Sequence, residues 1–270
     1  MPELTSAVFF ALLPFAFFHY YVLLALVQVF VISFKLANYF KKWIGGYTGG
    51  LPQCHTAGSR NHLLFILVNY MEIYLVRHTA PDVAKGVCYG QADIDVAPTF
   101  LTEAAIIQKH LPENIGTVYS SPLIRCKKLA EHLFAGHTIQ LHNDLKEINC
   151  GQWELKVWDD IPKAVIDPWM KDFVTVRIPD GESYEDLYHR VKNVFLYMQQ
   201  KATPAIIVAH GGVIRSILSY ITNTPLKDSF AAFTLHYGCV IKISSVDGVL
   251  QHEVLSNIVH EKETHKPSNL

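Results

Sequence analysis

An apolar run that ends in an arginine and a histidine is the most informative part of this sequence: Ile73-Tyr74-Leu75-Val76-Arg77-His78-Thr79-Ala80-Pro81. Four consecutive apolar residues are typical of a short strand that is covered on both faces of a sheet. In a parallel sheet, ligands bind beyond the carboxyl ends of the strands. We therefore predict a buried strand over residues 72–76 that presents Arg77 and His78 at the ligand-binding edge.

The same pattern occurs a second time, late in the chain, as Ala205-Ile206-Ile207-Val208-Ala209-His210-Gly211-Gly212. One histidine after a strand is more often structural than catalytic, but two strand ends of one sheet can converge on a single site. The glycines after His210 let the backbone approach a ligand closely. We therefore expect His78 and His210 to face the same site.

A third strand end lies between them, in Val118-Tyr119-Ser120-Ser121-Pro122-Leu123-Ile124-Arg125-Cys126. Hydroxyl groups and backbone amides at the start of a helix favour a phosphate, and arginine offers a planar fork of donors to the phosphate oxygens. The alternative for Arg125 is a solvated position on the surface. Together with the two histidines, this segment indicates a phosphate site.

From Met71 onward, short apolar runs alternate with helical stretches, which predicts an α/β layer fold. Strands are predicted at residues 72–76, 117–120, 138–141 and 205–209. Helices are predicted at residues 101–111, 123–134 and 185–197, and Ser183 with Asp186 forms a capping box before the last of them. Two further strands, at 239–244 and 249–254, flank Val246-Asp247-Gly248 as a hairpin.

The composition excludes several classes of function. The chain has 270 residues, half of them apolar, and a formal net charge of -1, which indicates neither a nucleic-acid partner nor disorder. A small molecule is the expected partner. The five cysteines are odd in number and lack CxxC spacing, which speaks against a zinc site or a disulfide scaffold and favours reduced thiols in the cytosol. They are Cys54, Cys88, Cys126, Cys150 and Cys239.

The amino-terminal part has a different character. Residues 4–34 contain no Asp, Glu, Lys or Arg, and about 20 apolar residues suffice to cross a bilayer, so we predict one transmembrane helix within residues 1–45. Lys35, Lys41 and Lys42 follow the apolar run, which favours a cytoplasmic carboxyl side and a catalytic part in the cytoplasm. The alternative is a buried helix of a soluble protein. Residues 46–70 show no periodicity and are interpreted as a linker.

Several separated motifs from Met71 to about residue 257 resemble the histidine phosphatase, or phosphoglycerate mutase-like, superfamily. Its Arg-His-Gly signature corresponds to Arg77-His78-Thr79, and its second arginine and second histidine correspond to Arg125 and His210. The run Leu145-Lys146-Glu147-Ile148-Asn149-Cys150-Gly151-Gln152-Trp153-Glu154 is similar to the family's Leu-x-Glu-x-x-x-Gly-x-Trp-Glu. The resemblance implies a three-layer αβα domain with a mostly parallel sheet over residues 71–260, followed by a polar tail at 261–270.

The resemblance also implies a mechanism without a metal or another cofactor. His78 is expected to attack phosphorus and to form a phosphohistidine, with His210 beside the phosphoryl oxygens. Glu147 takes the place of the acid that protonates the leaving oxygen and then activates water. The substrate's phosphate is expected to contact four further residues: Arg77, Arg125, Thr79 and Gln91. The alternative for Thr79 is that its side chain faces the core. The tryptophans Trp153, Trp158 and Trp169 are expected to pack in a core rather than to stack on a substrate.

The branch that the motifs resemble is that of the alpha-ribazole phosphatases, through Thr79, Cys88-Tyr89-Gly90-Gln91-Ala92-Asp93 and the residues after Arg125. This implies removal of the 5'-phosphate of alpha-ribazole phosphate in cobalamin biosynthesis. One alternative is a sugar-phosphate phosphatase of broad specificity or a phosphoglycerate mutase. Another is a catalytically dead binding module anchored to the membrane.

Residues 1–49 resemble the carboxyl-terminal end of cobalamin synthase, on Ala37-Asn38-Tyr39-Phe40-Lys41-Lys42-Trp43-Ile44-Gly45-Gly46-Tyr47-Thr48-Gly49. The similarity ends at Gly50, and regular periodicity returns after Met71. Our hypothesis is that a frameshift has joined two adjacent reading frames, with residues 50–69 translated out of frame. The alternative is a membrane-tethered phosphatase with a genuine linker.

Overall fold

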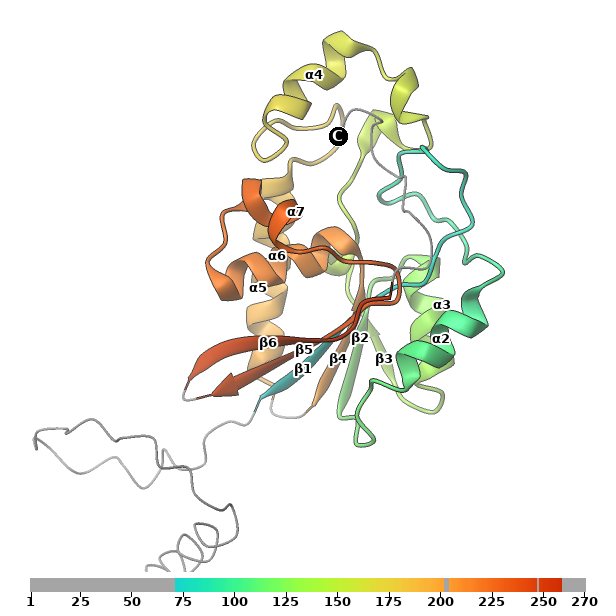
Figure 1. The fold of residues 1–270 in the computed structure, drawn as a ribbon, viewed down its shortest axis with the longest axis vertical. Coiled ribbons are helices and arrows are strands. Elements are labelled where there is room, and N and C mark those ends of the chain that lie inside the picture. The colour runs from blue at the N-terminus through green and yellow to red at the C-terminus, as the bar shows by residue number, and fades with distance from the viewer. Residues whose placement is uncertain (1–70, 202–203, 247, 259–270) are drawn as a thin grey trace, which may run out of the picture. The chain divides into compact units, whose positions relative to one another are not determined.

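The computed structural model describes residues 71–201, 204–246 and 248–258, and a six-stranded mixed sheet forms their centre (Figure 1). The strands are β1 (Glu72–Arg77), β2 (Thr117–Ser120), β3 (Ile139–Leu141), β4 (Ala205–Ala209), β5 (Val240–Val246) and β6 (Val249–Ser256). Their order in the sheet is β3-β2-β4-β1-β5-β6. The first four strands are parallel, and β5 and β6 are antiparallel to their neighbours. The predicted mostly parallel sheet and its carboxyl-terminal hairpin are confirmed.

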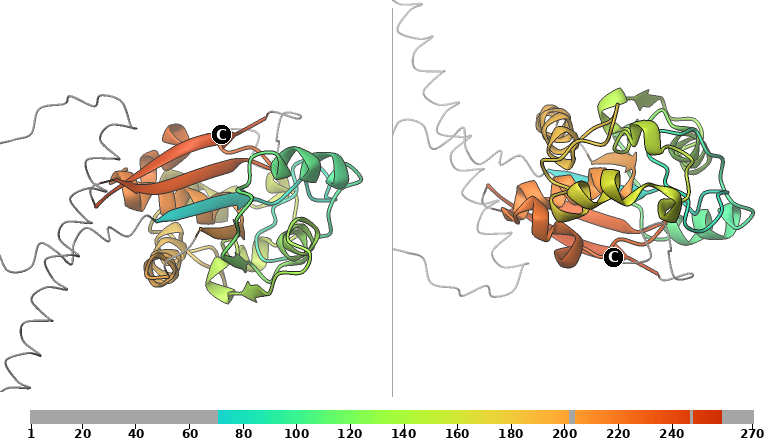
Figure 2. Two further views of the ribbon diagram at one scale, coloured as in Figure 1. Left: turned by 90° about the horizontal axis from the view of Figure 1, so that it is seen from below. Right: turned by 90° about the horizontal axis from the view of Figure 1, so that it is seen from above.

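Helices cover both faces of the sheet (Figures 1 and 2). Successive residues of a strand point to opposite faces. In β4, Ile207 packs in one core cluster with α5 (Tyr184–Gln199) and α6 (Gly211–Thr222). Its neighbours Ile206 and Val208 pack in a second cluster with α2 (Phe100–Gln108) and α3 (Ile124–Leu133). This is the expected three-layer αβα arrangement.

Between β3 and α5, the chain forms an excursion that extends beyond the carboxyl ends of the parallel strands (Figure 1). It contains the 3-10 turns Asn143–Leu145, Gly151–Trp153 and Trp158–Asp160 and the helix α4 (Lys163–Lys171). Trp153, Trp158 and Trp169 pack against one another there, with ring centroids 5.4–6.0 Å apart. Since they share a third hydrophobic cluster with Ile161 and Ile166, the expected core packing of the tryptophans is confirmed.

The first residues of two helices, α5 and α6, test the predictions made from local sequence signals. At α5, Ser183 Oγ accepts the backbone N–H of Asp186, and the Asp186 carboxylate accepts the N–H of Ser183, so the predicted capping box is present. We predicted no helix after His210, yet α6 begins directly at Gly211. Two glycines lower the local helix propensity, but burial of the apolar side of α6, including Val213 and Ile217, stabilises the helix.

The remaining elements are the 3-10 turn Leu226–Asp228 and the helix α7 (Ser229–Ala232). Within the described part of the chain, no helix combines the length and apolar character that a membrane crossing requires. The predicted transmembrane segment at residues 4–34, the linker at 46–70, the tail at 261–270, Cys54 and the hairpin's Asp247 all lie outside the described residues.

Ile207 lies at the centre of the sheet, in a strand with neighbours on both sides, and its side chain is fully buried. We expect Ile207→Ala to lower the free energy of unfolding by about 2–5 kcal/mol, because it removes buried methyl groups and leaves a cavity. Denaturant unfolding followed by circular dichroism measures this. Val249→Ala, on β6 with 62% of the residue exposed, is the control and should change stability by less than about 0.5 kcal/mol. Equal losses in both variants would contradict the assignment.

Candidate active site

The two predicted strand-end histidines lie together because β1 and β4 are direct neighbours. Arg77 is paired with Ala209, and the backbone N–H of His78 donates to the Ala209 carbonyl at 3.0 Å. His78 and His210 therefore leave the sheet side by side, and the centroids of their rings are 5.1 Å apart. Both side chains are buried. The expected convergence of the two histidines is what the structure shows.

A hydrogen bond at one ring nitrogen of His78 decides which of the two nitrogens carries the proton. Nδ1 lies 2.7 Å from the carbonyl oxygen of Thr79, which can only accept, so Nδ1 carries the proton. This hydrogen bond fixes the tautomer in which Nε2 has a lone pair. The Thr79 side chain is itself fully buried, and its hydroxyl has no hydrogen-bond partner within the described residues. Its predicted phosphate contact stays a prediction.

Arg77 and Arg125 bring two positive charges to this end of the sheet. The Arg77 guanidinium donates to the carbonyl of Leu235 and lies 4.0 Å above the Tyr237 ring. A Cβ atom on Gly211 would lie 3.4 Å from Arg77 Nε, so the start of α6 is in contact with the same group. These contacts hold the guanidinium between the end of β1 and the start of α6.

Arg125 is fully buried, which rules out the alternative of a solvated surface position. Its Nη1 donates to the carbonyl of Ala92 at 2.9 Å, and its Nη2 donates to the carbonyl of Gly90 at 2.6 Å. No carboxylate among the described residues forms an ion pair with it, and its Nε has no hydrogen-bond partner there. The guanidinium is therefore held by neutral dipoles, and its charge is not neutralised by an acid.

Glu147 lies at the amino-terminal end of α6. Its Oε2 accepts the backbone N–H of Gly212 at 3.0 Å, and its Oε1 accepts the N–H of Ile148. A Cβ atom on Gly212 would lie 2.3 Å from Oε1, so the carboxylate occupies space that any larger residue would fill. The predicted approach of the backbone at Gly211-Gly212 is therefore to Arg77 and Glu147 themselves.

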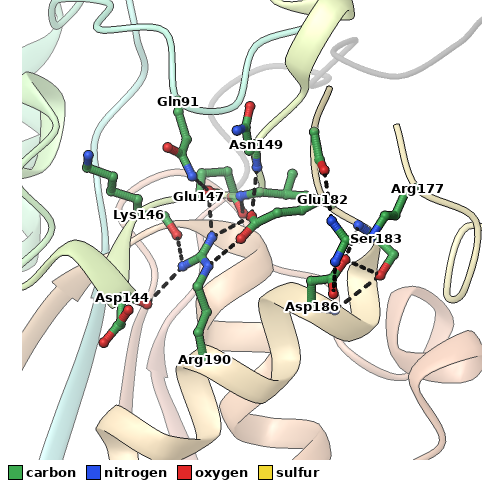
Figure 3. Close-up of polar contacts among 12 residues, drawn as sticks. Gln91, Asp144, Lys146, Glu147, Asn149, Arg177, Glu182, Ser183, Asp186 and Arg190 are labelled. Atoms are coloured by element: carbon green, nitrogen blue, oxygen red, sulfur yellow. Dashed lines mark hydrogen bonds and ion pairs between the residues drawn. The ribbon is translucent and has the colours of Figure 1, made fainter. Parts of the chain in front are cut away.

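The backbone of Glu147 is held by a second set of contacts (Figure 3). Its carbonyl accepts Nε2 of Gln91 at 3.0 Å and Nη2 of Arg190 at 2.8 Å. Arg190 forms a bidentate ion pair with Glu182 and also donates to the carbonyls of Asp144 and Lys146. Gln91 thus contacts the candidate acid, and its predicted contact with the substrate's phosphate stays a prediction.

The pKa of His210 is strongly perturbed by its surroundings. Burial, with added repulsion from the Arg125 guanidinium, holds the pKa of His210 well below its usual value, so its ring is neutral. Its Nε2 lies 2.8 Å from Ser121 Oγ. The site therefore contains the neutral imidazole of His210 together with two guanidinium groups.

Three further residues line this region although no sequence motif marks them as site residues: Ser121, Tyr89 and Tyr237. The hydroxyls of Tyr89 and Tyr237 are 2.5 Å apart, and each ring lies beside one of the two arginines. Burial and the neighbouring Tyr237 hydroxyl raise the pKa of Tyr89 well above its usual value, so this tyrosine keeps its proton. No local motif pairs tyrosines so far apart in the chain, whereas the hydroxyl of Ser121 belongs to the strand end that precedes Arg125.

Comparisons with known proteins agree with this geometry. The structure resembles that of the alpha-ribazole phosphatase from Shigella flexneri with a TM-score of 0.64, at 20% sequence identity, over 71% of this chain and 100% of the other. At this identity the likeness shows the fold alone. A metal-independent phosphoserine phosphatase of Arabidopsis thaliana is 31% identical over 165 residues, which are 56% of this chain and 69% of the relative.

A 6-phosphofructo-2-kinase/fructose-2,6-bisphosphatase of Arabidopsis thaliana is 26% identical over 177 residues. The match takes in 62% of this chain but only about a quarter (24%) of that larger relative. Residues 73–257 match the family model of the histidine phosphatase superfamily, branch 1, and they include all the residues of the site. The chain therefore belongs to the histidine phosphatase superfamily.

Proposed function

We propose that this protein is a phosphomonoesterase that works through a phosphohistidine on His78. The observation that carries the proposal is the hydrogen bond from His78 Nδ1 to the Thr79 carbonyl, which fixes the tautomer in which Nε2 has the lone pair of a nucleophile. The relative from Arabidopsis thaliana that is named as a metal-independent phosphoserine phosphatase supports the reaction class. The substrate is a small phosphorylated molecule.

The proposed reaction has two steps that balance in protons. In the first, the lone pair of His78 Nε2 attacks phosphorus while protonated Glu147 gives its proton to the departing oxygen. In the second, the Glu147 carboxylate takes a proton from water, and the resulting hydroxide attacks phosphorus and releases His78. Arg77 and Arg125 stabilise the charge on the phosphoryl oxygens in both steps.

The neutral state of His210 refines its role in this scheme. A neutral imidazole offers a hydrogen bond to a phosphoryl oxygen but no full positive charge. The charge that offsets the phosphoryl group therefore comes from the two arginines. His210, at the start of α6, supplies a hydrogen bond whose geometry the Ser121 hydroxyl helps to set.

For the substrate, we propose alpha-ribazole 5'-phosphate, and thus a role in cobalamin biosynthesis. The support is the resemblance of Thr79, of residues 88–93 and of residues 1–49 to proteins of that pathway. We place the catalytic domain in the cytoplasm. It is attached to the membrane if residues 4–34 are translated and inserted. A sugar-phosphate phosphatase, a phosphoglycerate mutase and a dead binding module are the other outcomes that assays distinguish.

Phosphate release tests both the class and the substrate. We expect the full chain, in the presence of EDTA, to release phosphate from alpha-ribazole phosphate with a higher kcat/KM than from phosphoserine, 3-phosphoglycerate or fructose phosphates. His78→Ala should lower kcat/KM on the order of 10⁴-fold or more and abolish acid-labile phosphate on the protein. His189→Ala, at an exposed position on α5, is the matched control. Equal activity of the His78 variant and wild type would refute the proposal.

Glu147→Gln separates the two steps. The p-nitrophenolate anion leaves without needing a proton, so phosphorylation of His78 by p-nitrophenyl phosphate should persist, whereas hydrolysis of the phosphohistidine should slow about 10²–10⁴-fold. We expect a burst of one equivalent of p-nitrophenol followed by slow turnover in stopped-flow measurements. With an alkyl phosphate the same variant should show no burst. A variant that turns over both substrates at the wild-type rate would remove Glu147 from the mechanism.

The buried neutral His210 predicts a pH dependence of stability. The unfolded chain protonates this histidine below about pH 6.5, while the folded protein does not, so acidification favours unfolding. Below that pH, His210 should remove up to about 1.4 kcal/mol of stability per pH unit. Denaturant unfolding at pH 7.5, 6.5 and 5.5 should show this slope in wild type and in the exposed-site control His189→Gln, but reduced in His210→Gln. Identical slopes in all three proteins would show that His210 is not held neutral.

A further inference from the structure

The Glu154 carboxylate accepts four backbone N–H groups. Its Oε2 accepts those of Gly90 at 2.9 Å and Ala92 at 3.1 Å, and its Oε1 accepts those of Gln91 at 2.8 Å and Cys150 at 3.0 Å. A carboxylate has about four acceptor positions, so each is used. Hydrogen bonds to a charged group are about twice as strong as neutral ones. Three of the four hold consecutive residues of one segment.

The same segment holds Arg125 from its other side. The Arg125 guanidinium donates hydrogen bonds to the carbonyls of Gly90 and Ala92. The backbone N–H groups of the same two residues donate hydrogen bonds to the Glu154 carboxylate. Each of these two residues thus links the carboxylate to the guanidinium through its own backbone. The segment belongs to no helix or strand, so regular structure does not fix these carbonyls.

Two further contacts show that residues 90–93 are fastened as a unit. A Cβ atom on Gly90 would lie 1.9 Å from the carbonyl oxygen of Ile148, so the segment packs directly against the chain that leads from Glu147 to Glu154. At its other end, Asp93 Oδ1 accepts the backbone N–H of Ile124, in the first turn of α3 beside Arg125. Glu154 provides the largest group of these contacts.

We propose that Glu154 is a positioning residue for the phosphate site, acting on Arg125 through the carbonyls of Gly90 and Ala92. The inference rests on the proposed function of Arg125 as a phosphate ligand. A phosphate fork requires a guanidinium whose direction is set before the substrate binds, because reorienting it during the reaction costs part of the stabilisation. Glu154 sets that direction without forming an ion pair that would neutralise Arg125.

The test is a double-mutant cycle with Glu154→Gln and Arg125→Lys. In Glu154→Gln, the side-chain NH₂ group would face backbone N–H groups, and two donors cannot form a hydrogen bond. The substitution would therefore release residues 90–92 from this anchor. We expect Glu154→Gln to lower kcat/KM and to weaken competitive inhibition by inorganic phosphate, each about 10–100-fold. In the Arg125→Lys background, where no fork remains to be oriented, the same substitution should change both values less than about 3-fold.

Controls separate positioning from loss of stability. Glu72→Gln changes another carboxylate with little exposure, at the amino end of β1, and should leave kcat/KM and phosphate inhibition within about 2-fold of wild type. If Glu154→Gln does not fold, Glu154→Asp keeps the charge but shortens the reach and should show the same coupling at smaller size. Free energies of unfolding are measured for every variant.

Two results would overturn the inference. One is an effect of Glu154→Gln that is undiminished in the Arg125→Lys background. The other is a Glu154→Gln protein that loses stability while its kcat/KM and phosphate inhibition stay at wild-type values. Failure of the proposed function has a different signature, because wild type itself would then hydrolyse none of the phosphomonoesters. Calorimetric binding of inorganic phosphate would still measure the coupling in that case.

Discussion

The parallel pairing of β1 with β4 is the contact on which the rest of the site depends. It joins two segments that are distant in the sequence and sets Arg77 opposite Ala209, so that His78 and His210 emerge from adjacent strand ends. The pairing is buried between helices on both faces, where every backbone polar group needs a partner. A shift by one residue would turn the strand's side chains to the opposite faces, so burial holds the register in place.

The charges of the site are held mainly by backbone groups. Arg125 donates to two carbonyls, and Arg77 donates to a third, while the Glu147 carboxylate accepts backbone N–H groups. A carbonyl orients a guanidinium without cancelling its charge, so the charge stays available for a phosphate. Arg190 differs, because it forms a bidentate pair with Glu182 and serves the backbone around Glu147. Arg77 and Arg125 thus keep their charge for a phosphate, whereas Arg190 stabilises the backbone around Glu147.

Several elements could be predicted because their signals are local. Short runs of strand-forming residues located β2 and β4 to the residue, and the capping box located the start of α5. The helices α4 and α6 were missed for different local reasons. A proline lies inside α4, and two glycines open α6, so propensity opposed both helices. Tertiary burial decided in favour of α6.

The sequence by itself determined the residue types of the site and their attachment to strand ends, because an apolar run followed by Arg-His or His-Gly is a local pattern. It also carried the family motif that contains Glu147 and Glu154. Only the tertiary structure decided that Arg125 donates hydrogen bonds to two carbonyls, that the hydroxyls of Tyr89 and Tyr237 are hydrogen-bonded and that His210 is neutral. The physical reason is that backbone carbonyls have no side-chain signature and that burial depends on what the whole chain packs around a residue.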